Sequence, residues 1–194
     1  MKLMSYNDLV IEKNNIGEHI TYLDKLSTIQ WKNKRNIIIN RDNNCCKICK
    51  EKETLNIDGE GFRDMAKEEK ENFLDQYYSD KKNKESIEFG FKPAIPMVKV
   101  DKVMYLHVHH TYYINNKLPW EYSNDSLITL CQECHQKIHE NSDIPVYLDD
   151  RMLTEMELTK CSRCKGSGFL EQFHYYLNGV CFRCDGNKYD EFIE

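Results

Sequence analysis

Four Cys-x-x-Cys pairs constrain what this 194-residue chain can fold into more than any other feature of its sequence. The pairs account for eight of the nine cysteines and leave over Cys45; they are Cys46/Cys49, Cys131/Cys134, Cys161/Cys164 and Cys181/Cys184. Zinc takes four ligands in a tetrahedron, and a Cys-x-x-Cys turn offers two thiolates from one tight loop. Free thiols or a redox pair are the alternative, but four pairs at one spacing are hard to reach by accident.

Two such turns complete one closed site, so the sequence predicts two structural Zn²⁺ ions. Pairing in order along the chain predicts that Cys46 and Cys49 join Cys131 and Cys134, and that the last four cysteines form a separate zinc knuckle.

The composition indicates small cores that need metal to support them. Hydrophobic residues are 40% and charged residues 30%, while aromatic residues, at 11%, are too frequent for a disordered chain. The sequence has no apolar stretch long enough to span a bilayer and no apolar core of a secretory signal near its start, so we expect a cytoplasmic protein without a membrane partner. In that reducing compartment, paired cysteines are more often zinc ligands than disulfides.

The net charge of −5 argues mildly against a protein that coats nucleic acid, because phosphate binding relies on Lys and Arg. The charges are unevenly distributed, however. Residues 1–50 hold nine Lys/Arg and five Asp/Glu, a balance of +4, so the remaining residues carry −9. A basic face is therefore compatible with an acidic whole.

Hydrophobic spacing and turn residues predict a mixed order of helices and strands. We expect helices at residues 20–29, 31–39 and 62–78, and one that begins near Ser126 to Cys131 and runs through His139. Residues 97–105 and 106–110 are expected as strand, and residues 114–119 as the turn that sends the chain back. We expect residues 1–30 to be an N-terminal extension, 31–150 one domain with an insertion at about 51–104, and 151–194 the zinc knuckle.

The histidines indicate the chemistry of the protein more directly than the cysteines do. Three of the seven, His107, His109 and His110, lie within four residues, and His135 and His139 follow directly after Cys134. A spacing of four puts two imidazoles on one face of a helix, where a single ion can reach both. Alternation along a strand puts His109 and His110 on opposite sides, so one can bind metal while the other moves protons.

At these residues the sequence resembles the HNH endonuclease family, whose ββα-metal core is a two-stranded hairpin followed by a helix that grips one catalytic ion. The resemblance runs over residues 106–113, 120–122 and 127–139, together with the preceding helix at 31–42 and Cys46-x-x-Cys49. It implies a small zinc-stabilised α+β protein with a treble-clef-like HNH core. Residues 51–104 are an insertion where the family usually has a much shorter link.

Carried over by position, the resemblance makes His109, His135 and His139 the ligands of a catalytic divalent ion and His110 the general base. A second or alternative metal ligand is the competing role for His110. An all-imidazole set is softer than Mg²⁺ prefers, so Mn²⁺, Ni²⁺ or Zn²⁺ are also candidates for the ion. A backbone carbonyl on the other nitrogen of His110 is needed to fix its tautomer.

The sequence departs from the family pattern at one position. The central asparagine of the family, which ties the hairpin loop, falls at Ser126, with Asn124 just upstream. Either Asn124 takes over this loop-bracing role or Ser126 caps the following helix, for which serine is well suited. How rigidly the hairpin holds His110 depends on which of these two roles is correct.

Several residues near the motif could serve either packing within the protein or its function. His107 lies on the His109 side of the strand and is expected to be half-buried, although contact with phosphate or support of a ligand are alternatives. Four aromatic residues could stack on bases, but packing is more usual in a small zinc-supported core. They are Tyr112, Tyr113, Trp120 and Tyr122.

The C-terminal pairs look like the CxxCxGxG zinc modules of DnaJ-type proteins, with the second copy truncated to CxxCxG. They occupy residues 161–168 and 179–186. Arg163, Lys165 and Arg183 at the knuckle tips either place positive charge on nucleic acid or a protein, or belong to an element that merely stabilises the chain end. Both possibilities stay open.

The resemblance implies a metal-dependent endonuclease that hydrolyses phosphodiester bonds in DNA, with RNA as a possible substrate. Its rival is a non-catalytic, zinc-scaffolded nucleic-acid-binding or adaptor module, in which His135 and His139 only support structure. A protein partner or a homodimer is compatible with either function.

Overall fold

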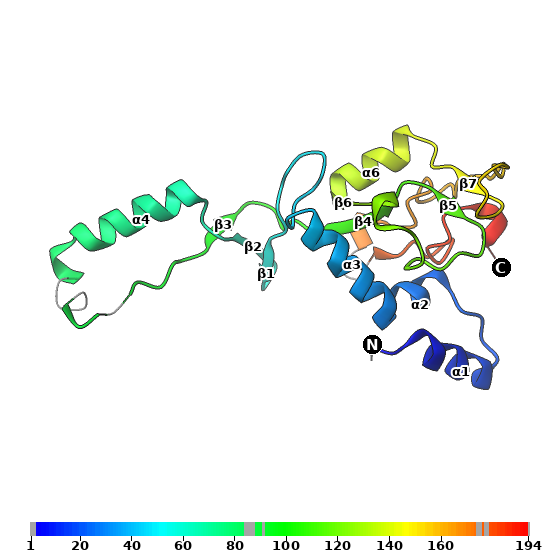
Figure 1. Ribbon diagram of the computed structural model, residues 1–194, viewed down its shortest axis with the longest axis horizontal. Helices are drawn as coiled ribbons and strands as arrows, with labels where there is room; N and C mark the ends of the chain where they lie inside the picture. The colour runs from blue at the N-terminus through cyan, green and yellow to red at the C-terminus, as the bar shows by residue number, and fades with distance from the viewer. Residues whose placement is uncertain (1–2, 84–87, 91, 174–175, 177–178, 194) are drawn as a thin grey trace. The chain divides into compact units, whose positions relative to one another are not determined.

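The computed structural model describes residues 3–83, 88–90, 92–173, 176 and 179–193, and the chain divides into two compact units (Figure 1). The histidine unit comprises Met1–Glu51 and Leu106–Glu194, and the insert unit comprises Lys52–Tyr105. The segment expected as an insertion thus lies in the insert unit. The expected division into extension, domain and knuckle stays a prediction. None of the helices in the described part of the chain is long and apolar enough to cross a membrane.

Three capped helices begin the histidine unit: α1 (Tyr6–Ile16), α2 (Tyr22–Leu26) and α3 (Ile29–Arg41). The helix predicted over residues 31–39 is confirmed and extends further in both directions. The single helix predicted over residues 20–29 is wrong. Thr28 has an extended backbone between α2 and α3, and its hydroxyl oxygen accepts a hydrogen bond from Trp31 N–H. Because serine and threonine hydroxyls satisfy nearby backbone groups, they favour helix ends over helix interiors.

The core of the histidine unit is a two-stranded antiparallel sheet of β4 (Leu106–His110) and β6 (Leu127–Cys131). The strand predicted over residues 106–110 is confirmed. Leu106, Leu127 and Leu130 are fully buried, together with Ile38 from α3. Alternation turns His107 and His109 toward α6 (Gln132–Asn141) and His110 toward Trp31 of α3. The two helices therefore cover opposite faces of the sheet.

The helix expected to begin near Ser126 to Cys131 starts later than predicted, at Gln132. Residues 127–131 are strand instead, because they complete the pairing with β4 and bury their aliphatic side chains there. Ser126 is not a helix cap: it ends the short 3₁₀ helix η2 (Asn124–Ser126), and its hydroxyl donates to Ser123 O. The cap of α6 is Cys131, whose Sγ accepts the N–H of Cys134 at 3.5 Å.

The loop between β4 and β6 is held by a second small sheet. In it β5 (Tyr113–Ile114) pairs in parallel with β7 (Val146–Tyr147), which follows α6. Tyr122 is buried within the loop, and its hydroxyl accepts the N–H of Ile114 at 2.8 Å. The predicted turn contains Asn116, which has a φ of 61°. The loop is therefore internally braced although it is long.

The insert unit contains a three-stranded antiparallel sheet of β1 (Leu55–Ile57), β2 (Glu60–Arg63) and β3 (Val98–Val100). Between β2 and β3 the chain forms the helix α4 (Lys67–Ser79) and the short 3₁₀ helix η1 (Lys81–Asn83). The helix predicted over residues 62–78 therefore begins too early. Phe62 lies in β2, and Glu69 accepts hydrogen bonds from Ala66 N–H and Arg63 at the true helix start. The strand predicted over residues 97–105 is limited to β3.

The C-terminal knuckle is built from two Cys-x-x-Cys turns rather than from regular strands. Isolated bridges join Lys160 to Tyr189 and Phe169 to Val180, and short 3₁₀ helices η3 (Glu171–Phe173) and η5 (Asp190–Phe192) follow the turns. Its core consists of Leu170 and the four cysteine side chains, all buried. Since this core is so small, the knuckle depends on its sulfur cluster for stability.

We expect Gly168→Ala to destabilise the protein more than Gly17→Ala. Both glycines have left-handed backbones, with φ of 73° and 70°, and that conformation alone costs a non-glycine residue about 1 kcal/mol. A Cβ on Gly168 would lie 2.8 Å from Gly186 O, whereas a Cβ on Gly17 meets nothing within 4 Å. The clash adds roughly 1–3 kcal/mol, so urea unfolding should separate the two variants. Equal losses of unfolding free energy would contradict the packing described here.

Candidate metal centres and histidine site

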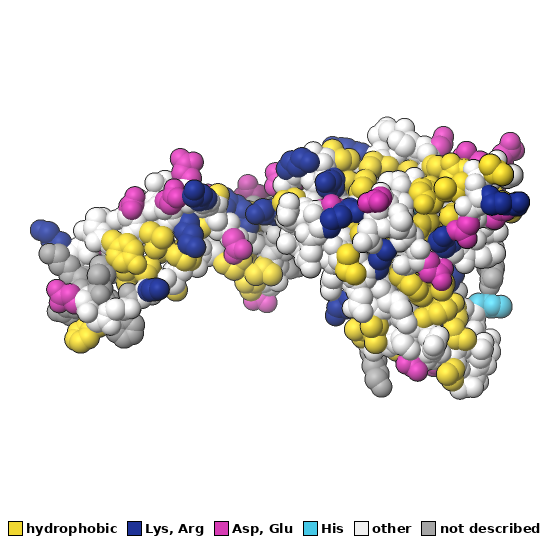
Figure 2. Space-filling view, in the orientation of Figure 1, with side chains coloured by type: hydrophobic (Ala, Val, Ile, Leu, Met, Phe, Trp, Pro, Cys, Tyr) yellow, Lys and Arg dark blue, Asp and Glu magenta, His cyan; other side chains and the backbone are white. Residues whose placement is uncertain are grey.

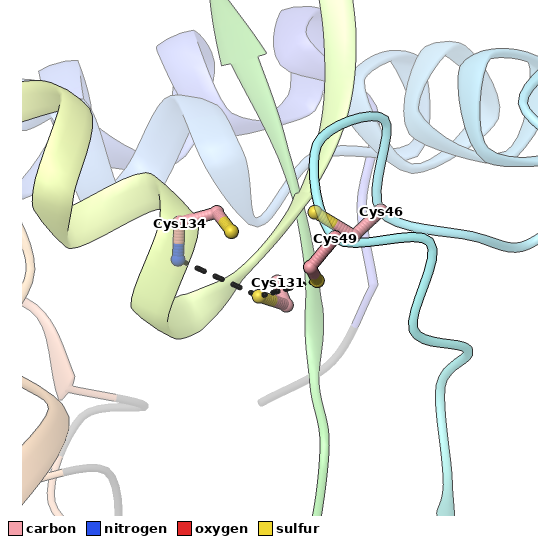
Figure 3. A group of neighbouring side chains, drawn as sticks. All are labelled: Cys46, Cys49, Cys131 and Cys134. Atoms are coloured by element: carbon pink, nitrogen blue, oxygen red, sulfur yellow. Dashed lines mark hydrogen bonds between the residues drawn. The ribbon is translucent and has the colours of Figure 1, made fainter.

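The first cysteine tetrad joins the loop after α3 to the start of α6. Figure 3 shows the sulfurs of Cys46, Cys49, Cys131 and Cys134 turned toward one another, and all four lie within 4.8 Å of each other. The Sγ atoms of Cys49 and Cys131 are 3.7 Å apart. That separation is close to the ~3.8 Å expected for two thiolates held tetrahedrally at ~2.3 Å from one zinc. The tetrad is therefore able to bind zinc.

The electrostatics of this tetrad suit a cation. Burial opposes ionisation of Cys46, but backbone N–H groups, including that of Cys131, point at its sulfur and lower its pKa to about 7. Burial and neighbouring sulfurs raise the pKa of Cys134. Four thiols so close together, three of them buried, cannot all ionise unless a positive charge lies among them, and Zn²⁺ would supply that charge.

The second tetrad lies in the knuckle and is more deeply buried. Cys161, Cys164, Cys181 and Cys184 are each 1% exposed or less, and their ligand atoms lie within 4.8 Å of one another. Two sulfur pairs are separated by 3.7 Å and 4.0 Å, and Gly168 N–H donates to Cys164 Sγ at 3.3 Å. The structure thus brings together the two sets of four that chain order predicts. Cys45 belongs to neither set, and its Sγ contacts Asn43 O.

A third group of ligands is formed by His109 of β4 with His135 and His139 of α6. One ring nitrogen from each lies within 4.8 Å of the other two. The ring centroids are 5.3 Å apart for His109–His135, 4.9 Å for His109–His139 and 4.7 Å for His135–His139. His109 Nδ1 and His139 Nε2 are buried without a hydrogen-bond partner. Buried orphan lone pairs that converge in this way fit a divalent cation.

All three imidazoles are held in the neutral form that metal binding requires. Burial, and then the positive charge of Lys188, lowers the pKa of His109 to about 4. Burial also lowers the pKa of His139 to about 3 and that of His135 well below its ordinary value. Their lone pairs are therefore available at neutral pH.

His110 lies on the opposite face of β4 and is 2% exposed. Its ring stacks on Trp31, with centroids 5.4 Å apart, and meets the edge of Tyr122 at 4.6 Å. Its Nε2 lies 3.0 Å from Pro119 O. Because a carbonyl can only accept, Nε2 carries the proton and Nδ1 keeps its lone pair. Burial is the main cause that lowers the pKa of His110 to about 3.

The group of candidate ligands found among the described residues contains His109, His135 and His139 but not His110. His107 is half-buried, as expected, and stacks on His135 with centroids 5.4 Å apart. Its other face meets Phe169 of the knuckle at 4.9 Å. His107 therefore holds the ring of one candidate ligand in place.

The aromatic residues of the loop pack against protein, as expected. Trp120 meets Tyr6 of α1 edge to face at 5.2 Å, and Tyr112 meets Tyr122 at 5.8 Å. At the knuckle tips, Arg163 lies 3.8 Å above the Phe182 ring, and Arg183 pairs with Asp190 at 3.1 Å. Lys165 is exposed. A role of these tips in binding nucleic acid or protein stays a prediction.

Residues that sequence reasoning missed hold the loop before β6. Lys34 of α3 donates to Asn124 Oδ1 at 2.7 Å, and Arg41 donates to the Asn124 backbone carbonyl. Asn124 thus contacts α3, and Ser126 O accepts the N–H of Thr111 at 2.9 Å. The sequence around a helical lysine or arginine does not predict hydrogen-bond partners that lie so far away in the chain.

Asp42, which caps the C-terminal end of α3, is another residue whose role the sequence did not predict. Its carboxylate is 5% exposed, pairs with Arg41 at 2.8 Å and accepts the N–H of Thr129 at 2.9 Å. Burial opposes its ionisation, but these hydrogen bonds lower its pKa below the ordinary value. Asp42 therefore ties the end of α3 to the strand that leads into Cys131.

Residues 97–141 match the family model described as HNH endonuclease. The match spans β4, β6 and α6 and includes all four histidines of the site. No curated protein and no solved structure matches the chain. The chain therefore contains an HNH domain, in a small α+β fold with two cysteine tetrads able to bind zinc. This confirms the resemblance and the fold class expected from the sequence, and an HNH domain indicates nuclease-type activity.

Substitution within either tetrad should remove one zinc and leave the other. We expect wild-type protein to retain two tightly bound zinc ions after dialysis against a weak chelator, and Cys134→Ser and Cys181→Ser to retain one each. Cys45→Ser is the matched control and should retain both, because Cys45 lies outside the tetrads. Mass spectrometry of metal content measures this. Loss of zinc from the control, or full retention in either tetrad variant, would refute the assignment.

The stability of the protein should fall as the pH drops below about 6.5. Unfolded His110 gains a proton near pH 6.5, whereas in the folded state its pKa is about 3. Between these values the unfolded state binds more protons, so acidification favours unfolding by up to about 1 kcal/mol per pH unit. His110→Asn should lose less stability than wild type between pH 6.5 and 5 in urea titrations. Identical slopes would show that His110 is not held neutral.

Proposed function

We propose that this protein is an endonuclease that hydrolyses phosphodiester bonds in DNA, with His110 as general base and a divalent ion held by His109, His135 and His139. One observation carries the proposal: three neutral imidazoles converge from a strand and the next helix, and two of them present buried nitrogens without partners. A cysteine tetrad able to bind zinc includes Cys131 and Cys134 at the start of the same helix, and the HNH match over residues 97–141 covers all the histidines of the site.

His110 has the protonation state that a general base needs. Its Nε2–H donates to Pro119 O, so Nδ1 is the nitrogen that takes a proton from the attacking water. The stack on Trp31 and the edge contact with Tyr122 hold the ring in one orientation. A bound divalent ion would stabilise charge on the phosphate and on the departing oxygen. The family resemblance implies products with 3′-hydroxyl and 5′-phosphate ends.

The ligand set and the cysteines support two further parts of the proposal. Three imidazoles favour Zn²⁺, Ni²⁺ or Mn²⁺ over Mg²⁺ as the working ion. All nine cysteines are free of disulfides, which agrees with a reducing compartment, and we place the protein in the cytoplasm.

One observation favours the rival function, a non-catalytic nucleic-acid-binding or adaptor module. His110 is almost fully buried, and a base must reach water. Figure 2 shows Lys/Arg and Asp/Glu side chains intermixed on the visible face of the histidine unit, where histidine surface is confined to one spot. The experiment below separates the two functions.

Plasmid nicking in Mg²⁺, Mn²⁺, Ni²⁺ or Zn²⁺ tests the proposal. His110→Ala should lower the rate at least about 100-fold while two zinc ions per chain are retained, because a general base contributes 10²–10⁴-fold. His109→Ala should also lose the exchangeable ion. Lys67→Ala, which changes an exposed residue of α4 outside the site, should cut like wild type. His110→Gln, closer in size, guards against loss of packing as the cause.

Two results would count against this function. Cleavage by His110→Ala and His110→Gln at the wild-type rate would remove His110 from the role of base. Failure of the wild-type protein to cut DNA or RNA with any of these ions, while it holds its zinc, would favour the adaptor function.

A further inference from the structure

A cavity of about 570 Å³ lies in the histidine unit between three segments that are distant in sequence. The segment from α1 to α2 forms one wall with Tyr22 and Lys25, the loop at β5 forms another with Tyr113, and the knuckle contributes Lys188. The cavity is lined by none of the first-tetrad cysteines and none of the three histidine ligands, and it touches the second tetrad only at Cys184. Neither the proposed metal sites nor the proposed base accounts for it.

Lys188 is the unusual residue of this cavity, because it is a lysine that is only 6% exposed. Its Nζ lies 3.5 Å from the centre of the Tyr22 ring and 4.5 Å from that of Tyr113. Within the part of the chain that the structure describes, no carboxylate pairs with it and no hydrogen bond to Nζ is found. A buried ammonium group that has no carboxylate partner is stabilised when an anion binds next to it.

The cavity adjoins the proposed catalytic histidines. Tyr113, which faces Lys188, also lies 5.3 Å from the ring of His110. An anion held by Lys188 would therefore lie one aromatic ring away from the site of cleavage.

Three of the other charged groups that line the cavity, which also include Lys25 and Asp185, have partners that lie close by. Lys13 pairs with Glu18 at 2.9 Å, Lys117 pairs with Asp150, and Glu191 accepts the N–H of Thr159. Lysine together with aromatic rings is a combination that binds the backbone and bases of a nucleic-acid strand. The cavity is large enough for one nucleotide.

We infer that Lys188 binds a backbone phosphate of the nucleic-acid substrate in this cavity, next to the phosphodiester bond that is cut. The inference rests on the proposed nuclease function for its substrate class. It gives the C-terminal zinc knuckle a part in the site, because the second tetrad holds the turn that carries Lys188: Cys161 N–H donates to Lys188 O at 2.9 Å.

The test measures binding of a fluorescent single-stranded oligonucleotide by anisotropy at several salt concentrations, without added divalent ion. Lys188→Met should weaken binding several-fold and reduce the slope of log K against log salt by about 0.7, the contribution of one phosphate contact on a single strand. Lys67→Met removes the same charge from an exposed position on α4 and should leave the slope unchanged. An unchanged slope in a folded, zinc-loaded Lys188→Met variant would overturn the inference.

A second measurement uses the wild-type protein, so it does not depend on how the variant folds. Reaction of lysines with an acetylating reagent, read by mass spectrometry, should show that the oligonucleotide protects Lys188 several-fold more than Lys67. Equal reactivity with and without oligonucleotide would overturn the inference. Binding that depends on Lys188 without any cleavage would instead refute the nuclease function alone, and cleavage with neither protection nor a slope change would refute the role of Lys188 alone.

Discussion

The arrangement of the site depends on Cys131, where the chain passes from strand to helix. This one residue ends β6, caps α6 through its Sγ, and joins the tetrad that ties α6 to the loop carrying Cys46 and Cys49. A ten-residue helix is too short to be stable alone in water. Zinc bound to the tetrad would therefore supply the free energy that holds His135 and His139 opposite His109.

The two faces of the β4–β6 sheet separate the histidines for which different roles are proposed. Strand alternation turns His109 toward α6, where three imidazoles converge, and His110 toward α3, where Trp31 and Pro119 fix its ring and its proton. Asp42, Lys34 and Arg41 attach α3 to β6 and to the loop that precedes it. Because these polar contacts are partly buried, loss of one partner leaves an unsatisfied group and is costly.

The C-terminal knuckle does more than stabilise the end of the chain. Phe169 packs on His107, which in turn stacks on His135, and Lys188 lies against Tyr113, a neighbour of His110. The second tetrad thus positions residues on both faces of the sheet. Its small apolar core could not do this alone, since four of its five buried members are the cysteines themselves.

The sequence by itself determined which side chains are able to meet at a metal, because the geometry of Cys-x-x-Cys turns, of histidines four apart on a helix and of alternation on β4 is local. It also predicted α3 and β4, whose hydrophobic patterns agree with their final environments. Only the tertiary structure decided that residues 127–131 form a strand, since the strand is defined by its pairing with β4. It alone decided the burial of His110 and the approach of Lys188 to the histidines. Desolvation and charge proximity depend on segments far apart in the chain, and no local pattern encodes them.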